Sequence, residues 1–248
     1  MKHFYTKSEQ IQSIIKGLNL TKTLYVSSII IGPPHIGKKT LASSVFPNAP
    51  VVSGEDQEQL KAALSNSDEL IISDFEKIKN QNELDLSHKR IIATANYLGN
   101  STVIDELFAF IYTVPPLSQR EEDVSYLKDL FIKEAESTLM IESMSAIDTE
   151  TIPLDLSLNN KSLKRSVYFH LIKHAMQSED IEEILYHYLL KHLEGNGAYR
   201  EHLGLYEKPL IRAGLEKYGS QLKLSEILGI NRNTLRKKIH EHHMDQEK

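Results

Sequence analysis

A glycine-bounded loop near the start of the chain has the residue types and spacing to hold phosphate groups. The stretch Gly32–Lys38 reads G-x-x-x-x-G-K and lies between an apolar run and a helix-like segment. In that context backbone N–H groups and the helix N-terminus surround phosphate oxygens, while the lysine reaches the terminal phosphates. We therefore expect a nucleotide site here. Its candidate residues in the loop are Gly32, His35, Ile36, Gly37, Lys38, Lys39 and Thr40.

Two features of this loop leave a second interpretation open. Lys39 stands where a Ser or Thr usually holds Mg²⁺, and Thr40 is one place later, about 100° further around the helix. Pro33 and Pro34 remove two N–H donors from the loop. The alternative is a turn that only resembles a phosphate loop.

An acidic residue follows the apolar run Leu70–Ser73, where a phosphate-loop protein places the carboxylate that orders Mg²⁺. Asp74 is this candidate metal ligand, although a helix cap or a surface acid is an equal alternative. In active ATPases of this type a glutamate usually follows at once, but here Phe75 does. Strand alternation would turn Glu76 to the face opposite residue 75. We therefore expect binding of ATP or ADP, with Mg²⁺ at Asp74, rather than hydrolysis.

The C-terminal segment has the pattern of two short helices joined by a tight turn. A helix is expected over Leu222–Leu228, then a Gly-Ile turn, then a helix over Arg232–His240 that Asn231 can cap. Leu235 and Ile239 are spaced to anchor this second helix inward. Its outer face suits the DNA major groove; a solvated basic helix end is the alternative. The candidate DNA-binding residues are Asn231, Arg232, Asn233, Thr234, Arg236, Lys237 and Lys238.

The charge of the chain is unevenly distributed. Its 248 residues include 29 Lys and Arg against 34 Asp and Glu, a net charge of −5. The stretch Lys208–His240 holds eight basic residues and two acids, so it carries +6 and leaves −11 for the remainder. This asymmetry indicates a basic, nucleic-acid-binding module attached to an acidic body.

The composition excludes several classes of protein. Without Cys there is no disulfide, thiolate zinc site or catalytic thiol, and a cytoplasmic location is favoured. The longest apolar run, Ile29–Ile31, is far shorter than the roughly 20 residues of a membrane span, so no membrane partner is expected. Of the metal ligands left, His240, His242 and His243 are better explained by a polar chain end than by a metal site.

The elements that would position these residues change type along the chain. From Tyr25 to Ala95, short Ile- and Val-rich runs alternate with helix-like segments, which predicts βαβ units around a parallel sheet. Beyond Pro115-Pro116 only helical periodicity continues. The expected strands are Tyr25–Ile31, Pro50–Val52, Leu70–Ser73 and Arg90–Ala95. The expected helices are Lys38–Phe46, Gln57–Ser65, Glu121–Met140, Lys161–Met176 and Ile181–Leu193, with a loop at Asp148–Asp155 and a linker at Glu194–Gly197.

The C-terminal pattern also resembles a known family. Tyr206–Ile211 and Leu228–Ile239 are similar to the Fis-type helix-turn-helix that ends bacterial enhancer-binding proteins of the nitrogen-regulator type, which are AAA+ activators of sigma-54 RNA polymerase. The resemblance extends upstream. Gly32–Lys39 resembles the family's GExGxGKE loop, Ile92–Asn96 its sensor strand, and Pro115–Val124 the PPLRERxEDI signature that opens a helical lid.

This resemblance implies a fold and further site residues. The implied fold class is α/β: a P-loop AAA+ parallel sheet with helices, then an α-helical lid and a small all-α helix-turn-helix domain. The implied ranges are 1–116 for the nucleotide-binding core, 117–178 for the lid and 179–248 for a linker helix with the Fis-type domain. Asn96 would sense the γ-phosphate, and Lys161 stands at the place of the second sensor's arginine.

The chain departs from that family in features that support hydrolysis and sigma-54 contact. Only 36 residues separate Gly37 from Asp74, and none of them resembles the GAFTGA loop that grips sigma-54. Ile104 and Phe110 stand at the places of the family's finger arginines, which raise the hydrolysis rate by orders of magnitude. These departures predict a degenerate core. Because the first expected strand begins at Tyr25, we expect no receiver domain ahead of it.

Three interpretations of function follow. The first is a sequence-specific DNA-binding transcriptional regulator whose degenerate AAA+ core binds ATP or ADP without efficient hydrolysis. The second is a slow or partner-completed ATPase, and the third an assembly partner of a full-length relative. Expected partners are double-stranded DNA, a second copy in a homodimer or higher homo-oligomer, and RNA polymerase or a related AAA+ regulator. The apolar strip for pairing, which could instead pack on the core or lid, is Ile181, Leu185, Tyr188, Leu189 and His192.

Overall fold

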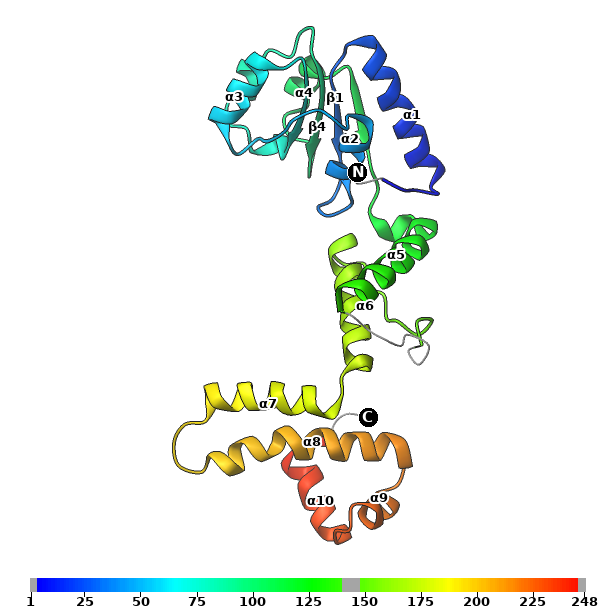
Figure 1. Cartoon of the computed structure of the whole chain (residues 1–248), viewed down its shortest axis with the longest axis vertical. Coiled ribbons are helices and arrows are strands. Elements are labelled where there is room, and N and C mark those ends of the chain that lie inside the picture. Colours follow the sequence, from blue (N-terminus) through cyan, green and yellow to red (C-terminus); the bar gives the residue numbers. More distant parts are fainter. Residues whose placement is uncertain (1–3, 140–147, 245–248) are drawn as a thin grey trace. The chain divides into compact units, whose positions relative to one another are not determined.

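Short apolar runs pair into a parallel sheet in the computed structural model, which describes residues 4–139 and 148–244 (Figure 1). The strand order is β2-β3-β4-β1-β5, and each neighbouring pair is parallel. Parallel neighbours require crossover connections, which helices usually supply. The strands are β1 (Ser28–Ile31), β2 (Val51–Ser53), β3 (Glu69–Ser73), β4 (Arg90–Ala95) and β5 (Phe110–Thr113).

The helices of this first unit, residues 1–175, are α1 (Glu9–Leu24), α2 (Lys38–Val45), α3 (Gln57–Asn66), α4 (Ser101–Leu107), α5 (Glu121–Leu139) and α6 (Asn160–Ala175). Figure 1 shows α1 and α3 on opposite faces of the sheet. Strand side chains alternate between those faces. Ile30, Ile71 and Ile92 pack with α1 and α2, whereas the register partners Ile29 and Ala93 pack with α3 and α4. Both faces of the sheet are therefore core.

A separate apolar core lies between α5 and α6. Leu117, in the 3₁₀ turn η3 (Leu117–Gln119), and Ile152, from the segment before α6, extend this core. The buried residues that the two helices contribute are Val124, Phe131, Ala135, Leu163, Val167 and Leu171. The helices after Pro115-Pro116 thus have a packing centre of their own.

The sequence pattern predicted neither α1 nor β5. The strand expected from Tyr25 begins at Ser28, because α1 continues to Leu24 and Tyr25 ends it with a left-handed backbone (φ 54°). β5 is an edge strand that exposes Phe110 and Ile111, so it lacks the buried apolar run of the central strands β1, β3 and β4. Met140, the predicted end of one helix, lies outside the described residues.

Residues 176–248 form a second compact unit, built from helices. They are α7 (Ser178–His192), α8 (Ala198–Tyr218), α9 (Gln221–Ile227) and α10 (Arg232–Glu241). A ring nitrogen of His202 on α8 lies 3.2 Å from the carbonyl oxygen of His192 on α7. The core of this unit is Ile211, Leu224, Leu235 and Ile239. The sequence pattern did not predict α8, which contains Pro209, a residue that disfavours helix interiors.

Within the described ranges, neither unit has a helix with the length and hydrophobicity needed to cross a membrane.

A buried ion pair joins three parts of the first unit. The Arg120 guanidinium lies 3.2 Å from a carboxylate oxygen of Asp123, and both side chains are almost fully buried. Asp123 also accepts hydrogen bonds from the Thr6 hydroxyl (2.8 Å) and the Lys7 N–H (2.7 Å). Arg120 donates a second hydrogen bond to the Ile36 carbonyl in the glycine-bounded loop (3.4 Å). The pair therefore links the N-terminal segment, α5 and that loop.

Replacing Asp123 by Ala should destabilise the first unit by about 3–5 kcal/mol, because the substitution leaves the Arg120 charge buried without its partner. Urea denaturation measures this loss. The matched control is Glu122→Ala, an exposed acid on the same helix, whose effect should stay within about 0.5 kcal/mol. Equal losses in the two variants would contradict a structural role for the buried pair.

Candidate functional site

The glycine-bounded loop connects β1 to the N-terminus of α2. His35 (φ 62°) and Gly37 (φ 94°) bend it with left-handed backbones. Gly32 has no room for a side chain, because a Cβ there would collide with the Val114 carbonyl oxygen. A hollow of about 300 Å³ lies in front of the loop. The predicted nucleotide-binding residues that line it are His35, Gly37, Lys38, Lys39, Thr40, Asp74 and Asn96.

Lys38 is buried and its side chain bonds back to the start of the loop. Its ammonium donates hydrogen bonds to the carbonyl oxygens of Gly32 and Pro33, both at 2.7 Å, and to the Asn96 side-chain oxygen at 3.0 Å. Burial lowers the pKa of Lys38 to about 8, although the nearby carboxylates Glu76 and Asp74 oppose this shift. The ammonium thus sits among oxygen acceptors, an arrangement that also suits phosphate oxygens.

Glu76 contacts Asn96, a residue of the site, although Glu76 itself does not line the hollow. β3 ends at Ser73, and Asp74 takes a left-handed backbone (φ 56°) ahead of the 3₁₀ turn η1 (Phe75–Lys77). Strand alternation therefore does not apply beyond Ser73. The Asn96 amide donates to one Glu76 carboxylate oxygen (2.6 Å), and the other oxygen is buried without a partner. Lys38, Asn96 and Glu76 form one polar chain, which the sequence pattern missed.

Asp74 is paired with the residue that replaces the usual Ser or Thr. The Lys39 ammonium lies 3.1 Å from its carboxylate. Burial favours a raised pKa for Asp74, but hydrogen bonding and charge from Lys39 outweigh it and lower the pKa below its ordinary value. Asp74 also precedes η1 without capping it through its side chain. The predicted metal ligand is therefore an ionised carboxylate already neutralised by a lysine.

Residues beside Lys161, rather than Lys161 itself, contact the loop. The Asn159 side-chain amide donates to the Pro34 carbonyl (2.9 Å), and the Asn160 N–H donates to the His35 carbonyl (3.2 Å). Lys161 is exposed on the first turn of α6 and is not among the residues that line the hollow.

Two predicted loop residues also lie outside the lining of that hollow. The Ile36 side chain is buried in the core beside the sheet. Gly32 contacts Lys38 only through its backbone carbonyl, which accepts a hydrogen bond from the ammonium. These two residues shape the loop, while their neighbours face the hollow.

The second helix of the C-terminal pair presents a cationic surface. Asn231 caps α10, since its side-chain oxygen accepts a hydrogen bond from the Asn233 N–H (2.8 Å). Leu235 and Ile239 are buried, as the spacing predicts, which turns the other positions outward. The exposed members of the predicted DNA-binding set are Arg232, Asn233, Thr234, Arg236 and Lys237, together with Asn231 itself.

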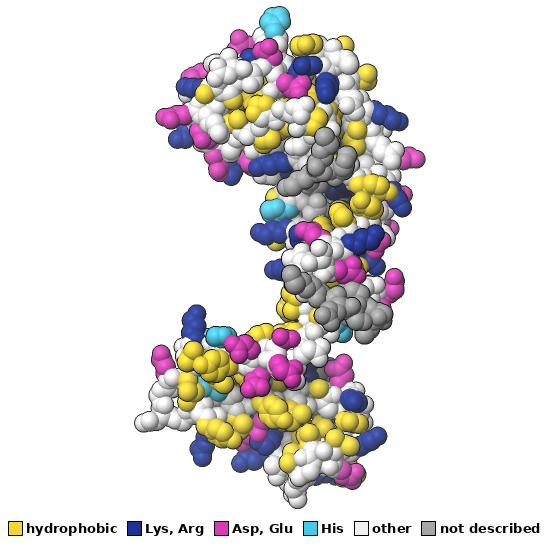
Figure 2. Space-filling model, viewed as in Figure 1, with side chains coloured by type: hydrophobic (Ala, Val, Ile, Leu, Met, Phe, Trp, Pro, Cys, Tyr) yellow, Lys and Arg dark blue, Asp and Glu magenta, His cyan; other side chains and the backbone are white. Residues whose placement is uncertain are grey.

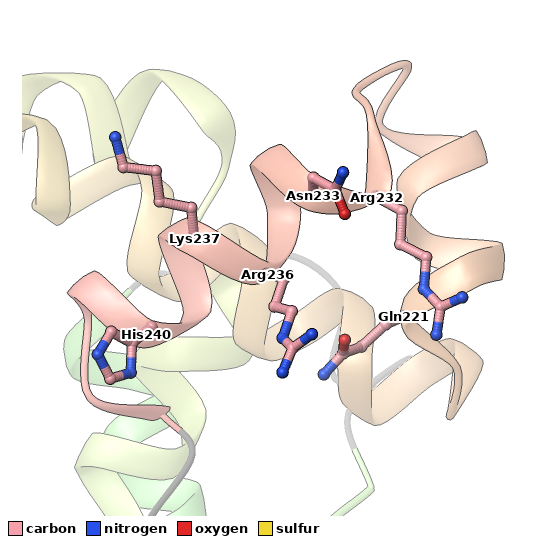
Figure 3. Close-up of a pocket in the computed structure, with 6 residues that line it drawn as sticks. All are labelled: Gln221, Arg232, Asn233, Arg236, Lys237 and His240. Atoms are coloured by element: carbon pink, nitrogen blue, oxygen red, sulfur yellow. The ribbon is translucent and has the colours of Figure 1, made fainter.

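Two residues that were not predicted belong to the same surface. Gln221, the first residue of α9, and His240 line one hollow with Arg236. Figure 3 shows the Gln221 and Arg236 side chains reaching into the same space, and Lys237 lines the same hollow. Packing of α9 against α10 brings Gln221 beside Arg236. No pattern of neighbouring residues in the sequence predicts this placement.

Lys238 differs from its neighbours on α10. It is half-buried, and its ammonium forms an ion pair with Glu207 of α8. This hydrogen bond from Lys238 lowers the pKa of Glu207, and His242 contributes in the same direction. Lys238 therefore ties α10 to α8 within the second unit.

Comparisons with known proteins identify the C-terminal module. Residues 203–242 match the model of the Fis family of bacterial regulatory proteins. A stretch of 66 residues is 44% identical to the DNA-binding transcriptional regulator NtrC of Azospirillum brasilense. That match covers 25% of this chain and 14% of the length of that NtrC.

Solved structures share the fold of almost the whole chain. NtrX from Brucella abortus in complex with ADP matches with a TM-score of 0.55 at 15% identity, covering 98% of this chain and 69% of the NtrX chain. NtrX in complex with ATP matches with a TM-score of 0.54 at 14% identity, covering 96% and 69%. The predicted class is confirmed: an α/β P-loop fold of the AAA+ type, followed by a helical region with a Fis-type helix-turn-helix. The chain is similar to NtrC-like AAA+ enhancer-binding proteins that end in this module.

The lowered pKa of Lys38 predicts a dependence of stability on pH. The ordinary lysine pKa is 10.5, and burial lowers that of Lys38 to about 8 in the folded protein. Between these values the unfolded chain binds more protons, so this residue makes the free energy of unfolding rise with pH. Below pH 8 the cost of burying the charge is complete. Denaturation from pH 7 to 10.5 should show the wild type gaining stability relative to Lys38→Met; a constant difference would contradict the shift.

Proposed function

We propose that this protein is a sequence-specific DNA-binding transcriptional regulator. The observation that carries the proposal is the exposed cationic face of α10, capped by Asn231 and anchored by Leu235 and Ile239 in a unit that matches the Fis family. The net charge of +6 over Lys208–His240 supports it, since Lys and Arg supply most of the affinity for DNA phosphates. The named relatives NtrC and NtrX support the same class of function.

In this proposal α10 enters the major groove of double-stranded DNA. Arg232 and Arg236 read base edges, because a guanidinium can bond two acceptors of guanine at once. Gln221 shares the space of Arg236, so it contacts a base or a phosphate beside that arginine. Lys237, an exposed lysine of the same helix, neutralises a phosphate. Lys238 contributes through Glu207, by fixing the angle of α10.

A second copy of the chain is proposed to complete the DNA-binding form as a homodimer or higher homo-oligomer. No residue of α7 in the described chain is buried, and Figure 2 shows hydrophobic side chains gathered over the second unit. Of the strip predicted for pairing, Ile181 and Tyr188 are exposed, whereas Leu185 and Leu189 are half-buried. Tyr188 also contacts His202 of α8, so α7 and α8 would form the pairing surface together. Two-fold pairing would present two copies of α10 to two half-sites.

We also propose that the first unit binds ATP or ADP at the glycine-bounded loop. The polar groups fit a nucleotide, since Lys38, Lys39 and Thr40 surround the hollow and would hold phosphates. Mg²⁺ has one anionic candidate ligand there, Asp74, and would replace Lys39 as its partner. A bound nucleotide supplies negative charge that these lysines neutralise. In this proposal it acts as a switch or structural ligand.

Efficient hydrolysis is not part of the first proposal, because residues 97–113 contain no Lys or Arg to act as a finger. Ile104, at one of the expected arginine places, is buried in the core beside the sheet. A slow ATPase is the second candidate function. It is favoured by the contact of the Glu76 carboxylate with Asn96, which lines the hollow, because a carboxylate beside the site could serve as a general base.

Substitutions on α10 test the DNA-binding proposal. Arg232→Ala and Arg236→Ala should each weaken binding by about 1–3 kcal/mol and relax sequence choice, as expected for lost base contacts. Lys237→Ala should weaken binding to all sequences and flatten its salt dependence. Fluorescence anisotropy at several salt concentrations measures both effects. Arg200→Ala, an exposed arginine on α8, is the control. Unchanged binding in all three α10 variants would refute this surface.

Nucleotide binding and hydrolysis need to be measured together. Lys38→Ala should weaken ATP and ADP binding by roughly 10- to 100-fold, the effect of losing a charged hydrogen-bond donor. Lys16→Ala, an exposed lysine on α1, should bind as the wild type does. The first proposal expects negligible ATP turnover. Turnover that disappears in both Lys38→Ala and Glu76→Gln would instead establish the slow ATPase.

A further inference from the structure

The N-terminal segment Phe4–Ser8 is held against α5 before α1 begins. Asp123 accepts hydrogen bonds from the Thr6 hydroxyl on both carboxylate oxygens (3.0 and 2.8 Å), and from the Lys7 N–H (2.7 Å). The Tyr5 ring stacks on Tyr126 with centroids 3.6 Å apart. We call Phe4–Ser8 the strap.

The strap forms one wall of an apolar hollow beside the phosphate loop. Phe4 and Tyr5 face Leu127 and Phe131 of α5 across it. The Phe4 ring lies against Gly37, with its nearest carbon 3.1 Å from where a Cβ would stand. The space that remains is about 170 Å³, smaller than the roughly 300 Å³ at which small-molecule sites begin.

This hollow and the one in front of the loop share lining residues. Gly37 and Thr40 line both. A nucleotide with its phosphates beside Lys38 would therefore direct its sugar and base toward the strap. Two buried polar atoms on residues lining the second hollow have no hydrogen-bond partner: the Asn160 side-chain oxygen and Arg120 Nε. Aromatic walls and free polar atoms suit a heterocyclic base.

We propose that the strap and the base of a bound nucleotide compete for this hollow, so that binding of ATP displaces Phe4–Ser8. The proposal rests on nucleotide binding by the first unit. Strap displacement frees Asp123 from Thr6 and Lys7, while its partner Arg120 contacts the Ile36 carbonyl. The state of the strap is thereby coupled to the phosphate loop, and the N-terminal segment reports whether the site is filled.

Strap variants should bind ATP more tightly than the wild type. Phe4→Ala removes the wall over Gly37, and Thr6→Val removes the hydroxyl that bonds Asp123 while keeping the side-chain shape. Isothermal titration calorimetry with ATP should show a gain of about tenfold in each, which for Thr6→Val corresponds to one to two lost hydrogen bonds of the strap. Hydrogen exchange gives a second readout on the wild type: ATP should speed exchange of the Lys7 amide.

Matched controls carry the same substitutions elsewhere in the first unit. Phe169→Ala changes an exposed ring on α6, and Thr23→Val changes an exposed hydroxyl that bonds within α1. Both should bind ATP as the wild type does. Weaker ATP binding by Phe4→Ala would show that the strap builds the base site, and it would overturn competition. Competition would also be overturned if both strap variants kept the wild-type affinity and ATP left exchange of the Lys7 amide unchanged.

The strap proposal and nucleotide binding fail in different ways. If the wild type binds ATP, Lys38→Ala does not, and the strap variants match the wild type, competition is wrong while nucleotide binding stands. If neither the wild type nor the strap variants bind ATP, both proposals are wrong. Binding that appears only in the strap variants would support competition most directly.

Discussion

The buried pair of Arg120 and Asp123 is the interaction on which the arrangement of the first unit depends. Two charges removed from water need each other and further hydrogen bonds to offset the cost of burial. Here those hydrogen bonds come from separate segments, from Thr6 and Lys7 ahead of α1 and from the Ile36 carbonyl in the loop, while Arg120 Nε is left without a partner. The N-terminal segment, α5 and the phosphate loop are thus joined by one network of hydrogen bonds around this ion pair.

Charged groups are also paired with protein partners at the proposed nucleotide site. Each cation of the loop has an acceptor within the protein, Lys38 through Asn96 and the loop carbonyls, and Lys39 through Asp74. Phosphate binding at such a site is an exchange of partners rather than a gain of new ones. In the proposed nucleotide complex this exchange would limit affinity, and it would release Asp74 and Asn96 from their present partners. Glu76 belongs to the same network through its hydrogen bond from Asn96.

The basic residues of α10 in the second unit have different surroundings. Arg232 and Arg236 are exposed, whereas Lys238 is tied to Glu207, although all three belong to one basic helix. Charge counted along the sequence treats these residues alike. Their difference comes from the angle at which α10 packs on α8 and α9, since a helical face is divided by what lies beneath it. In the proposed complex with DNA, the net charge of −11 on the remainder of the chain would disfavour contact with phosphates, so this small basic surface would make it.

Local patterns determined a large part of this protein. The cap at Asn231, the anchors Leu235 and Ile239, and the alternation of strands with helices follow from preferences that act within a few residues, so the sequence by itself predicted the helix-turn-helix and the parallel sheet. Contacts between distant residues were decided only by the tertiary structure: Thr6 with Asp123, Asn96 with Glu76, and Gln221 beside Arg236. These depend on how elements pack and on single backbone conformations, such as the left-handed Asp74, which leave no periodic signal in the sequence.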